Sequence, residues 1–230
     1  MQRRSFLRTA GAGTVVATAG CLTSVVGDDD GHTVLEPPKD PLRPDSPHPA
    51  PESALLSHGE SFPHFSLPDP IADTTVETNA LEGFLVWTAF YDFCTAECAP
   101  LISDLARVQY RMDELGYSDD VTFLAVTFDP ERDTLEVLQE NAAQRGVDLE
   151  AGNWHYLRPD DEAEAESIVA DDFGVVFERV GEGGGYDFKH AAVSVIANPA
   201  GYVERAYRSE VPEREGLAED LETALERWEE

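Results

Sequence analysis

Two cysteines four residues apart are the residues of this chain best suited to chemistry. Cys94 and Cys98 follow directly on the apolar run Gly83–Phe93, where a buried strand is expected to pass into a helix. Side chains at this spacing lie on one face of a helix. A helix N-terminus favours the thiolate, which binds soft metals such as Cu(I) and attacks disulfides. The pair predicts a metal site, a redox-active dithiol or a structural disulfide, and the spacing alone does not choose between them.

A metal held by two thiolates needs a further ligand, and His190 is the best placed candidate. It directly precedes the apolar run Ala191–Ile196, which is typical of a strand. A histidine at the start of a strand is, taken alone, more often structural than a ligand. Two thiolates suit Cu(I); two cysteines and one histidine could also form a zinc site, but zinc normally takes a fourth ligand. Five other histidines have no cysteine or acid at ligand spacing: His32, His48, His58, His64 and His155.

The rest of the chain supplies the elements that would position these residues. Nearly continuous apolar runs at Phe84–Tyr91 and Val121–Thr127 predict two strands buried on both faces. Apolar residues at helical spacing from Leu101 predict a helix that stops at Gly116, and Asp129–Thr134 opens a second helix. We therefore expect a strand–helix–strand–helix order in this half.

The C-terminal half is expected to end in a hairpin and a helix. The further elements predicted are a short first strand at 62–67, helices at 160–172 and 213–228, a hairpin around the turn 198–201, and an irregular segment that ends in the glycine-rich run 181–185. This order predicts an α/β fold, a thioredoxin-like sandwich with a central mixed sheet flanked by helices.

The N-terminal residues indicate export and lipid attachment. Arg3 and Arg4 begin a twin-arginine signature, and the weakly apolar stretch Ala10–Gly20 is shorter than the ~20 residues of a membrane span. Cys21 ends a lipobox-like sequence, so residues 1–20 are expected to be a signal peptide and Cys21 to be lipidated. The alternative is an uncleaved signal-anchor with a chance cysteine.

Residues 21–53 are expected to be a tether that carries the lipidated cysteine. They are rich in aspartate and proline, with seven prolines between Pro37 and Pro51, a composition that favours an extended, semi-rigid spacer. The remaining residues, 54–230, are enough for one domain with its own core.

The charge of the chain is strongly negative. Its 46 acidic and 16 basic residues give a formal charge of −30, and removal of the signal peptide would take away three arginines and no acid. The acids are scattered throughout, which predicts the surface of a halophilic protein more than a site for a cationic partner. No basic patch is present to neutralise phosphates, so nucleic acid binding is not expected.

Three motifs, in this order, resemble those of the Sco/SenC family of copper-assembly proteins. They are the Cys94–Cys98 pair, the segment Asp129–Thr134, and His190 ahead of a strand and the turn Asn198–Gly201. The likeness covers roughly residues 58–228, and the second motif separates the chain from ordinary thioredoxins. The resemblance implies a thioredoxin-like fold and one copper ion, Cu(I) and/or Cu(II), held by Cys94, Cys98 and His190. Together with the N-terminus, it indicates a haloarchaeal-type lipoprotein.

The same resemblance implies a function in assembly. Family members help to build the dinuclear copper site of a membrane cytochrome oxidase, as metallochaperones more than as enzymes. The implied partners are the copper-bearing oxidase subunit and a thiol redox partner, and the implied place is the extracytoplasmic membrane face, with Cys21 as anchor. One alternative is a metal-free thiol–disulfide oxidoreductase with Cys94 as nucleophile and Cys98 as resolving thiol. A peroxidase related to peroxiredoxins is less favoured, because the proline expected ahead of the nucleophile is missing.

Two residues depart from the family pattern. Thr95 follows the first cysteine, where the family usually has proline, and Lys189 precedes the histidine, where aspartate is typical. A cation beside the site would disfavour Cu(II) and help to hold thiolates. Our hypothesis is that Lys189 shifts the protein towards redox work.

Overall fold

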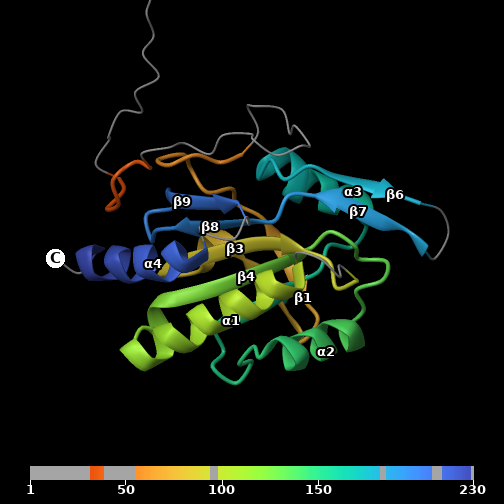
Figure 1. The fold of residues 1–230 in the computed structure, drawn as a ribbon, viewed down its shortest axis with the longest axis horizontal. Helices are drawn as coiled ribbons and strands as arrows, with labels where there is room; N and C mark the ends of the chain where they lie inside the picture. Colours follow the sequence, from red (N-terminus) through yellow and green to blue (C-terminus); the bar gives the residue numbers. More distant parts are fainter. Residues whose placement is uncertain (1–31, 39–54, 94–97, 182–184, 209–213, 229–230) are drawn as a thin grey trace, which may run out of the picture.

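A mixed sheet of five strands forms the centre of the fold (Figure 1). The computed structural model describes residues 32–38, 55–93, 98–181, 185–208 and 214–228. The sheet order is β5-β4-β3-β8-β9, and the strands are β3 Phe84–Phe90, β4 Val121–Thr127, β5 Trp154–Leu157, β8 Val193–Ala197 and β9 Val203–Arg208. β3, β4 and β5 run parallel, whereas β8 is antiparallel to both β3 and β9. The predicted α/β class with a central mixed sheet is confirmed.

Three helices pack together against the sheet: α1 Cys98–Leu115, α2 Leu135–Arg145 and α4 Arg214–Trp228. α1 contacts both α2 and α4. Two successive parallel crossovers, through α1 and α2, place these helices on the same face when both are right-handed. On this face Phe84 of β3 meets Trp228 of α4 edge-on, with ring centroids 5.8 Å apart. α1 ends at Leu115, and Gly116 follows with φ of 85°, as its place in the sequence predicts.

Aromatic packing closes the opposite face of the sheet. The short helix α3, Glu162–Ala165, continues as the π-helical η3, Glu166–Asp172. Phe173, directly after it, stacks on Trp87 of β3 with centroids 3.7 Å apart. Phe62 and Phe65 meet Phe173 edge-on. The chain therefore reaches its first strand only at β1, Ser66–Asp69, which pairs with β2, Thr74–Glu77. The strand predicted at 62–67 therefore starts too early. Its aromatic residues pack over the face of the sheet and do not pair with a neighbouring strand.

The segment expected to be irregular contains a hairpin. β6, Phe177–Val180, and β7, Asp187–His190, form a separate two-stranded antiparallel sheet. Each strand has only four residues, so the alternation of apolar and polar residues over Tyr186–His190 is a weak signal beside the glycine-rich stretch. β5 was not predicted either, for the same reason of length.

Residues 32–38, which the sequence places in the tether, pack on the domain. The side chain of Leu35 is buried, and the backbone N–H groups of Val34 and Leu35 donate to the carboxylate of Glu204 in β9. The extended-spacer interpretation therefore does not hold for these residues, because a buried carboxylate supplies them with acceptors. The rest of the expected tether lies outside the described residues.

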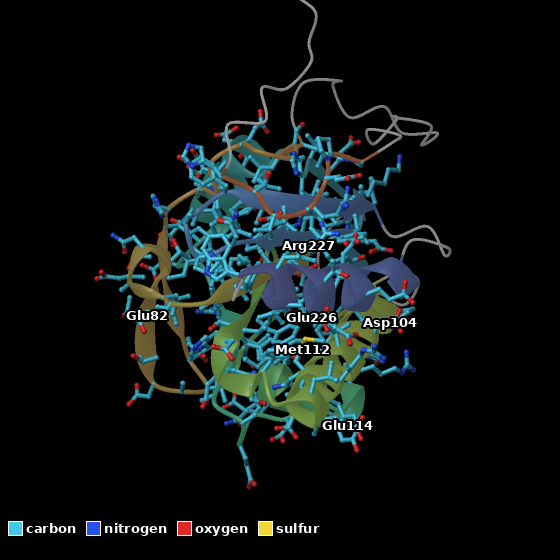
Figure 2. The ribbon with its side chains drawn as sticks, turned by 90° about the vertical axis from the view of Figure 1, so that its left-hand side faces the viewer. Glu82, Asp104, Met112, Glu114, Glu226 and Arg227 are labelled. Atoms are coloured by element: carbon cyan, nitrogen blue, oxygen red, sulfur yellow. The ribbon has the colours of Figure 1, made fainter. Side chains whose placement is uncertain are left out.

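The negative charge of the chain is spread over its surface. In Figure 2 the labelled acids lie on several parts of the chain: Asp104 and Glu114 on α1, Glu226 on α4 facing the viewer, and Glu82 just before β3, whereas the side chain of Met112 in α1 is fully buried. Dispersed carboxylates repel one another less than clustered ones. In the described ranges, no helix combines the length and the apolar character needed to cross a bilayer.

Candidate metal centre

His190 lies beside the end of the central strand β3. It is the last residue of β7, not the residue directly before the next strand, since β8 begins at Val193. Its half-buried ring meets Tyr91 edge-on, with centroids 5.5 Å apart, and Phe128 with centroids 5.0 Å apart. Tyr91 stands three residues before Cys94. The structure thus brings the predicted histidine to the strand end that leads to the predicted thiols.

The cysteines are described only in part. Cys98 is the first residue of α1, at the helix N-terminus. Cys94 and Cys21 lie outside the described residues, and so does Thr95. Within the ranges that the structure covers, no cluster of three histidine, cysteine or acidic side chains is arranged to hold a metal ion. The expected ligand set includes Cys94, so it stays a prediction.

The His190 ring is oriented by a backbone carbonyl. Its Nδ1 lies 3.2 Å from the carbonyl oxygen of Ala191. A proton on Nδ1 would be donated to that oxygen, and the lone pair of the ring would then be on Nε2. Metal-binding histidines in proteins commonly hold their second nitrogen in this way. The imidazole therefore fits a soft-metal site built with two thiolates.

Asp133 holds the chain just ahead of the cysteine pair. Its fully buried carboxylate accepts the backbone N–H of Asp92 at 3.2 and 3.3 Å, and it also accepts the hydroxyl of Thr127. The carboxylate of Asp92 in turn accepts the amide of Asn141 in α2 at 2.7 Å. Burial raises the pKa of Asp133 to about 7, against the lowering effect of the Thr127 hydroxyl. This aspartate therefore fixes the residue two positions before Cys94.

Asp129 and Arg132 hold the approach to His190. The buried carboxylate of Asp129 accepts the hydroxyl of Tyr186 at 2.7 Å and pairs with the guanidinium of Arg132. Arg132 also donates to the backbone carbonyl of Tyr186 at 2.8 Å. Tyr186 directly precedes β7, whose last residue is His190. The Asp129–Thr134 motif is thus bonded to both segments of the candidate site.

The ring of Tyr186 is packed between two cations. The guanidinium carbon of Arg132 lies 3.7 Å from the ring centroid, and that of Arg179 lies 3.5 Å from it. At these distances the two groups must occupy opposite faces of the ring, where each gains a cation–π attraction. Burial and the bond to Asp129 raise the pKa of Tyr186 to about 12, so the hydroxyl stays a donor at neutral pH.

Lys189 does not face the candidate site. Side chains alternate along β7, so the buried Phe188 and the exposed Lys189 lie on opposite faces, and His190 shares the face of Phe188. Lys189 pairs in register with Glu178 of β6. The hypothesis of a cation beside the thiolates therefore has no geometric support from this strand.

Tyr91 and Asp187 were missed by sequence reasoning. The hydroxyl of Tyr91 donates to the carboxylate of Asp187, which also accepts the backbone N–H of Phe188 at 2.8 Å. This bond ties the end of β3 to β7. The signal that could have revealed β7 is the strict alternation of apolar and polar residues over Tyr186–His190.

The family follows from comparison of the sequence. The sequence profile of the SCO1/SenC family matches residues 57–226. The chain belongs to the SCO1/SenC family. No sequence among the curated proteins matches it.

Solved structures of SCO1/SenC proteins have the same fold. A SCO1/SenC family lipoprotein from Bacillus anthracis is 20% identical with a TM-score of 0.60, over 76% of this chain and 98% of that one. BsSco, described as having a disulfide switch, is 18% identical with a TM-score of 0.60, over 74% and 96%. Bradyrhizobium japonicum ScoI with copper bound is 20% identical with a TM-score of 0.58, over 72% and 99%. The predicted thioredoxin-like fold is thereby confirmed.

The bond between Tyr186 and Asp129 predicts a specific loss of stability. Tyr186→Phe keeps the ring between its two cations but leaves a buried carboxylate short of a donor, so unfolding should cost about 1–3 kcal/mol less. Denaturant titration in molar salt measures this. Tyr110→Phe is the control, because Tyr110 is 63% exposed, and it should change stability by less than about 0.5 kcal/mol. Equal losses in the two variants would contradict the assignment.

The raised pKa of Asp133 predicts a pH dependence of stability. The folded pKa of about 7 lies above the usual aspartate pKa of 3.8, so the stability linked to this group is complete below pH ~4 and is lost as the pH rises to about 7. Asp133→Asn cannot ionise, so wild type should lose roughly 4 kcal/mol relative to the variant across this window. Unfolding free energies at pH 4 to 8 test this, with Asp119→Asn, at an exposed position, as control. A constant difference between wild type and Asp133→Asn would refute it.

Proposed function

We propose that this protein carries copper through Cys94, Cys98 and His190 to the dinuclear copper site of a membrane cytochrome oxidase, or reduces the thiols of that site. Membership of the SCO1/SenC family supports the proposal. The observation that carries it is the position of His190 against Tyr91, at the strand end that leads to the cysteine pair. A related ScoI has been solved with copper bound, and BsSco is described as a member of a family of cytochrome c oxidase assembly proteins.

Copper is cargo in this function, not a resident cofactor. Two thiolates and one imidazole form a soft donor set that favours Cu(I). Three ligands leave room for a ligand of the acceptor, so copper can move by stepwise ligand exchange. His190, on its own hairpin, would contribute the neutral donor.

We place the protein at the extracytoplasmic face of the membrane, anchored by lipid at Cys21. The twin-arginine signature at Arg3 and Arg4 and the lipobox-like sequence support this placement. The relative from Bacillus anthracis is itself described as a lipoprotein. Two acyl chains on one residue would give stable attachment, whereas a single chain gives only marginal binding.

Thiol reduction is the second candidate function, and the disulfide switch of BsSco favours it. The thiolate of Cys94 would attack a disulfide of the partner, forming a mixed disulfide and releasing one partner thiolate. The thiolate of Cys98 would then attack Cys94, releasing the second partner thiolate. The protein is left with one disulfide, and two electrons have passed to the partner.

Measurements of Cu(I) affinity in substituted proteins distinguish the proposed ligands from the other histidines. Reduced residues 22–230 in molar salt should bind one Cu(I) per chain. His190→Ala should weaken binding by at least about tenfold, or about 1.4 kcal/mol, and Cys94→Ser or Cys98→Ser should weaken it further. Competition with a Cu(I) chelator measures the affinities. His64→Ala, at an exposed position, should leave the affinity unchanged. Binding that ignores His190 would move the assignment to the redox function.

Thiol chemistry should survive the loss of the histidine. In the reduction of a model disulfide, His190→Ala should retain a rate within a factor of about two, because the exchange uses only the two sulfurs. Cys94→Ser should abolish the reaction, and Cys98→Ser should accumulate the mixed disulfide, visible by mass spectrometry. If Cys94→Ser accumulated it instead, the two roles would be reversed.

A further inference from the structure

The segment His32–Pro38, here called the docked segment, is held by a buried carboxylate. Glu204 of β9 is fully buried. One of its oxygens accepts the N–H of Val34 at 3.0 Å, and the other accepts the N–H of Leu35 at 2.9 Å. The side chain of Asn198 donates a third bond to Glu204 at 2.6 Å. Two of the three donor groups on this carboxylate thus come from a segment about 170 residues away in the chain.

Four further contacts fix the docked segment. The amide of Asn198 donates to the carbonyl of His32 at 2.7 Å, and the His32 ring stacks on Tyr202 with centroids 4.5 Å apart. Nε2 of His58 lies 2.8 Å from the carbonyl of Leu35. Arg227, labelled on α4 in Figure 2, donates to the carbonyl of Val34 at 3.0 Å. The side chain of Leu35 is 6% exposed.

The bonds of the docked segment satisfy the buried carboxylate of Glu204. A carboxylate taken out of water needs several donors, and a missing donor leaves a desolvation cost of about 1–3 kcal/mol or more for a charged group. Without the docked segment, Glu204 keeps only the bond from Asn198 among the contacts described. The segment therefore supplies two of the three donors to a carboxylate that is fully buried in the docked state.

Docking takes place at the end of the sheet opposite to the candidate metal centre. β8 is antiparallel to β3, and its last residue, Ala197, pairs with Leu85 near the start of β3. Val203 of β9 pairs with Ala197, which puts Glu204 at this same end. Cys94 follows the other end of β3. In Figure 1 the docked segment lies on the left, near the C-terminal end of α4. The seven residues of β3 separate the two ends by roughly 20 Å.

We infer that the docked segment sets the height and the orientation of the domain above the membrane. This rests on the proposed anchor at Cys21. From Cys21 to His32 the chain advances eleven residues, which span at most about 40 Å. Without docking, the next described residue is Leu55, and the 34 residues from Cys21 to Leu55 can span up to about 120 Å. Docking holds the domain close to the bilayer, with the end of the sheet that carries the site pointing away from the anchor.

Amide hydrogen exchange of the full chain tests the docking. The N–H groups of Val34 and Leu35 should exchange at least about 100-fold more slowly than in an unstructured peptide. Glu204→Gln should abolish this protection, because the NH2 group of the glutamine replaces one acceptor oxygen and would face a backbone N–H of the docked segment. Leu35→Ser, which changes the segment and leaves Glu204 in place, should do the same. Glu36→Gln, at an exposed position, is the matched control and should keep the protection. Unprotected amides in the wild type would overturn the docking.

Neutron reflectometry of the lipidated full chain on a supported bilayer tests the height. Wild type and Glu36→Gln should form a thin protein layer next to the headgroups, whereas Glu204→Gln and Leu35→Ser should form a layer that extends outward by tens of ångströms. Protein layers of equal thickness in all four proteins would show that the docked segment does not set the height of the domain. Failure of every protein to attach would overturn the anchor, and the height with it, while the exchange result would still decide the docking.

Discussion

Asp129 and Asp133 lie four residues apart on one loop, and each bonds a different part of the candidate site. Asp133 holds the backbone ahead of the cysteines, and Asp129 holds Tyr186 ahead of the strand that ends in His190. Burying two carboxylates is costly in a chain of charge −30. The charge of Asp129 is balanced by Arg132. The pKa of Asp133 is raised to about 7, so this carboxyl group can be buried in its neutral form. The position of His190 relative to the cysteine segment depends on both aspartates.

The parts of the fold that the sequence predicted are those with a strong local signal. The continuous apolar runs of β3 and β4, the helical spacing of α1 and the turn between β8 and β9 are readable within about ten residues each. β6 and β7 are four residues each. They are held in place by aromatic contacts with Phe128 and Tyr91, which lie far away in the sequence and leave no local pattern. β1 started later than predicted because Phe62 and Phe65 pack on Phe173, more than 100 residues away.

The same distinction applies to the functional residues. Cys98 and His190 were recognisable from residue type and from the family resemblance. The roles of Tyr91, Tyr186 and Arg132 rest on bonds between segments far apart in the chain, so their residue types alone gave no signal. The docked segment is the clearest case. Its proline-rich surroundings are typical of a spacer, and nothing local to Val34 or Leu35 indicates an acceptor at Glu204.

The strand order has a consequence for the timing of synthesis. β3 lies between β4 and β8, and the hydroxyl of Thr88 in β3 donates to the carbonyl of Val193 at 2.7 Å, across 105 residues. Cys94 and Cys98 therefore leave the ribosome long before the residues that close the sheet beside them, and domains of this kind fold as units. A nascent chain can offer two thiols but not the histidine. The complete proposed ligand set thus exists only after residue 190 has been synthesised, and metal taken up earlier would meet a different coordination.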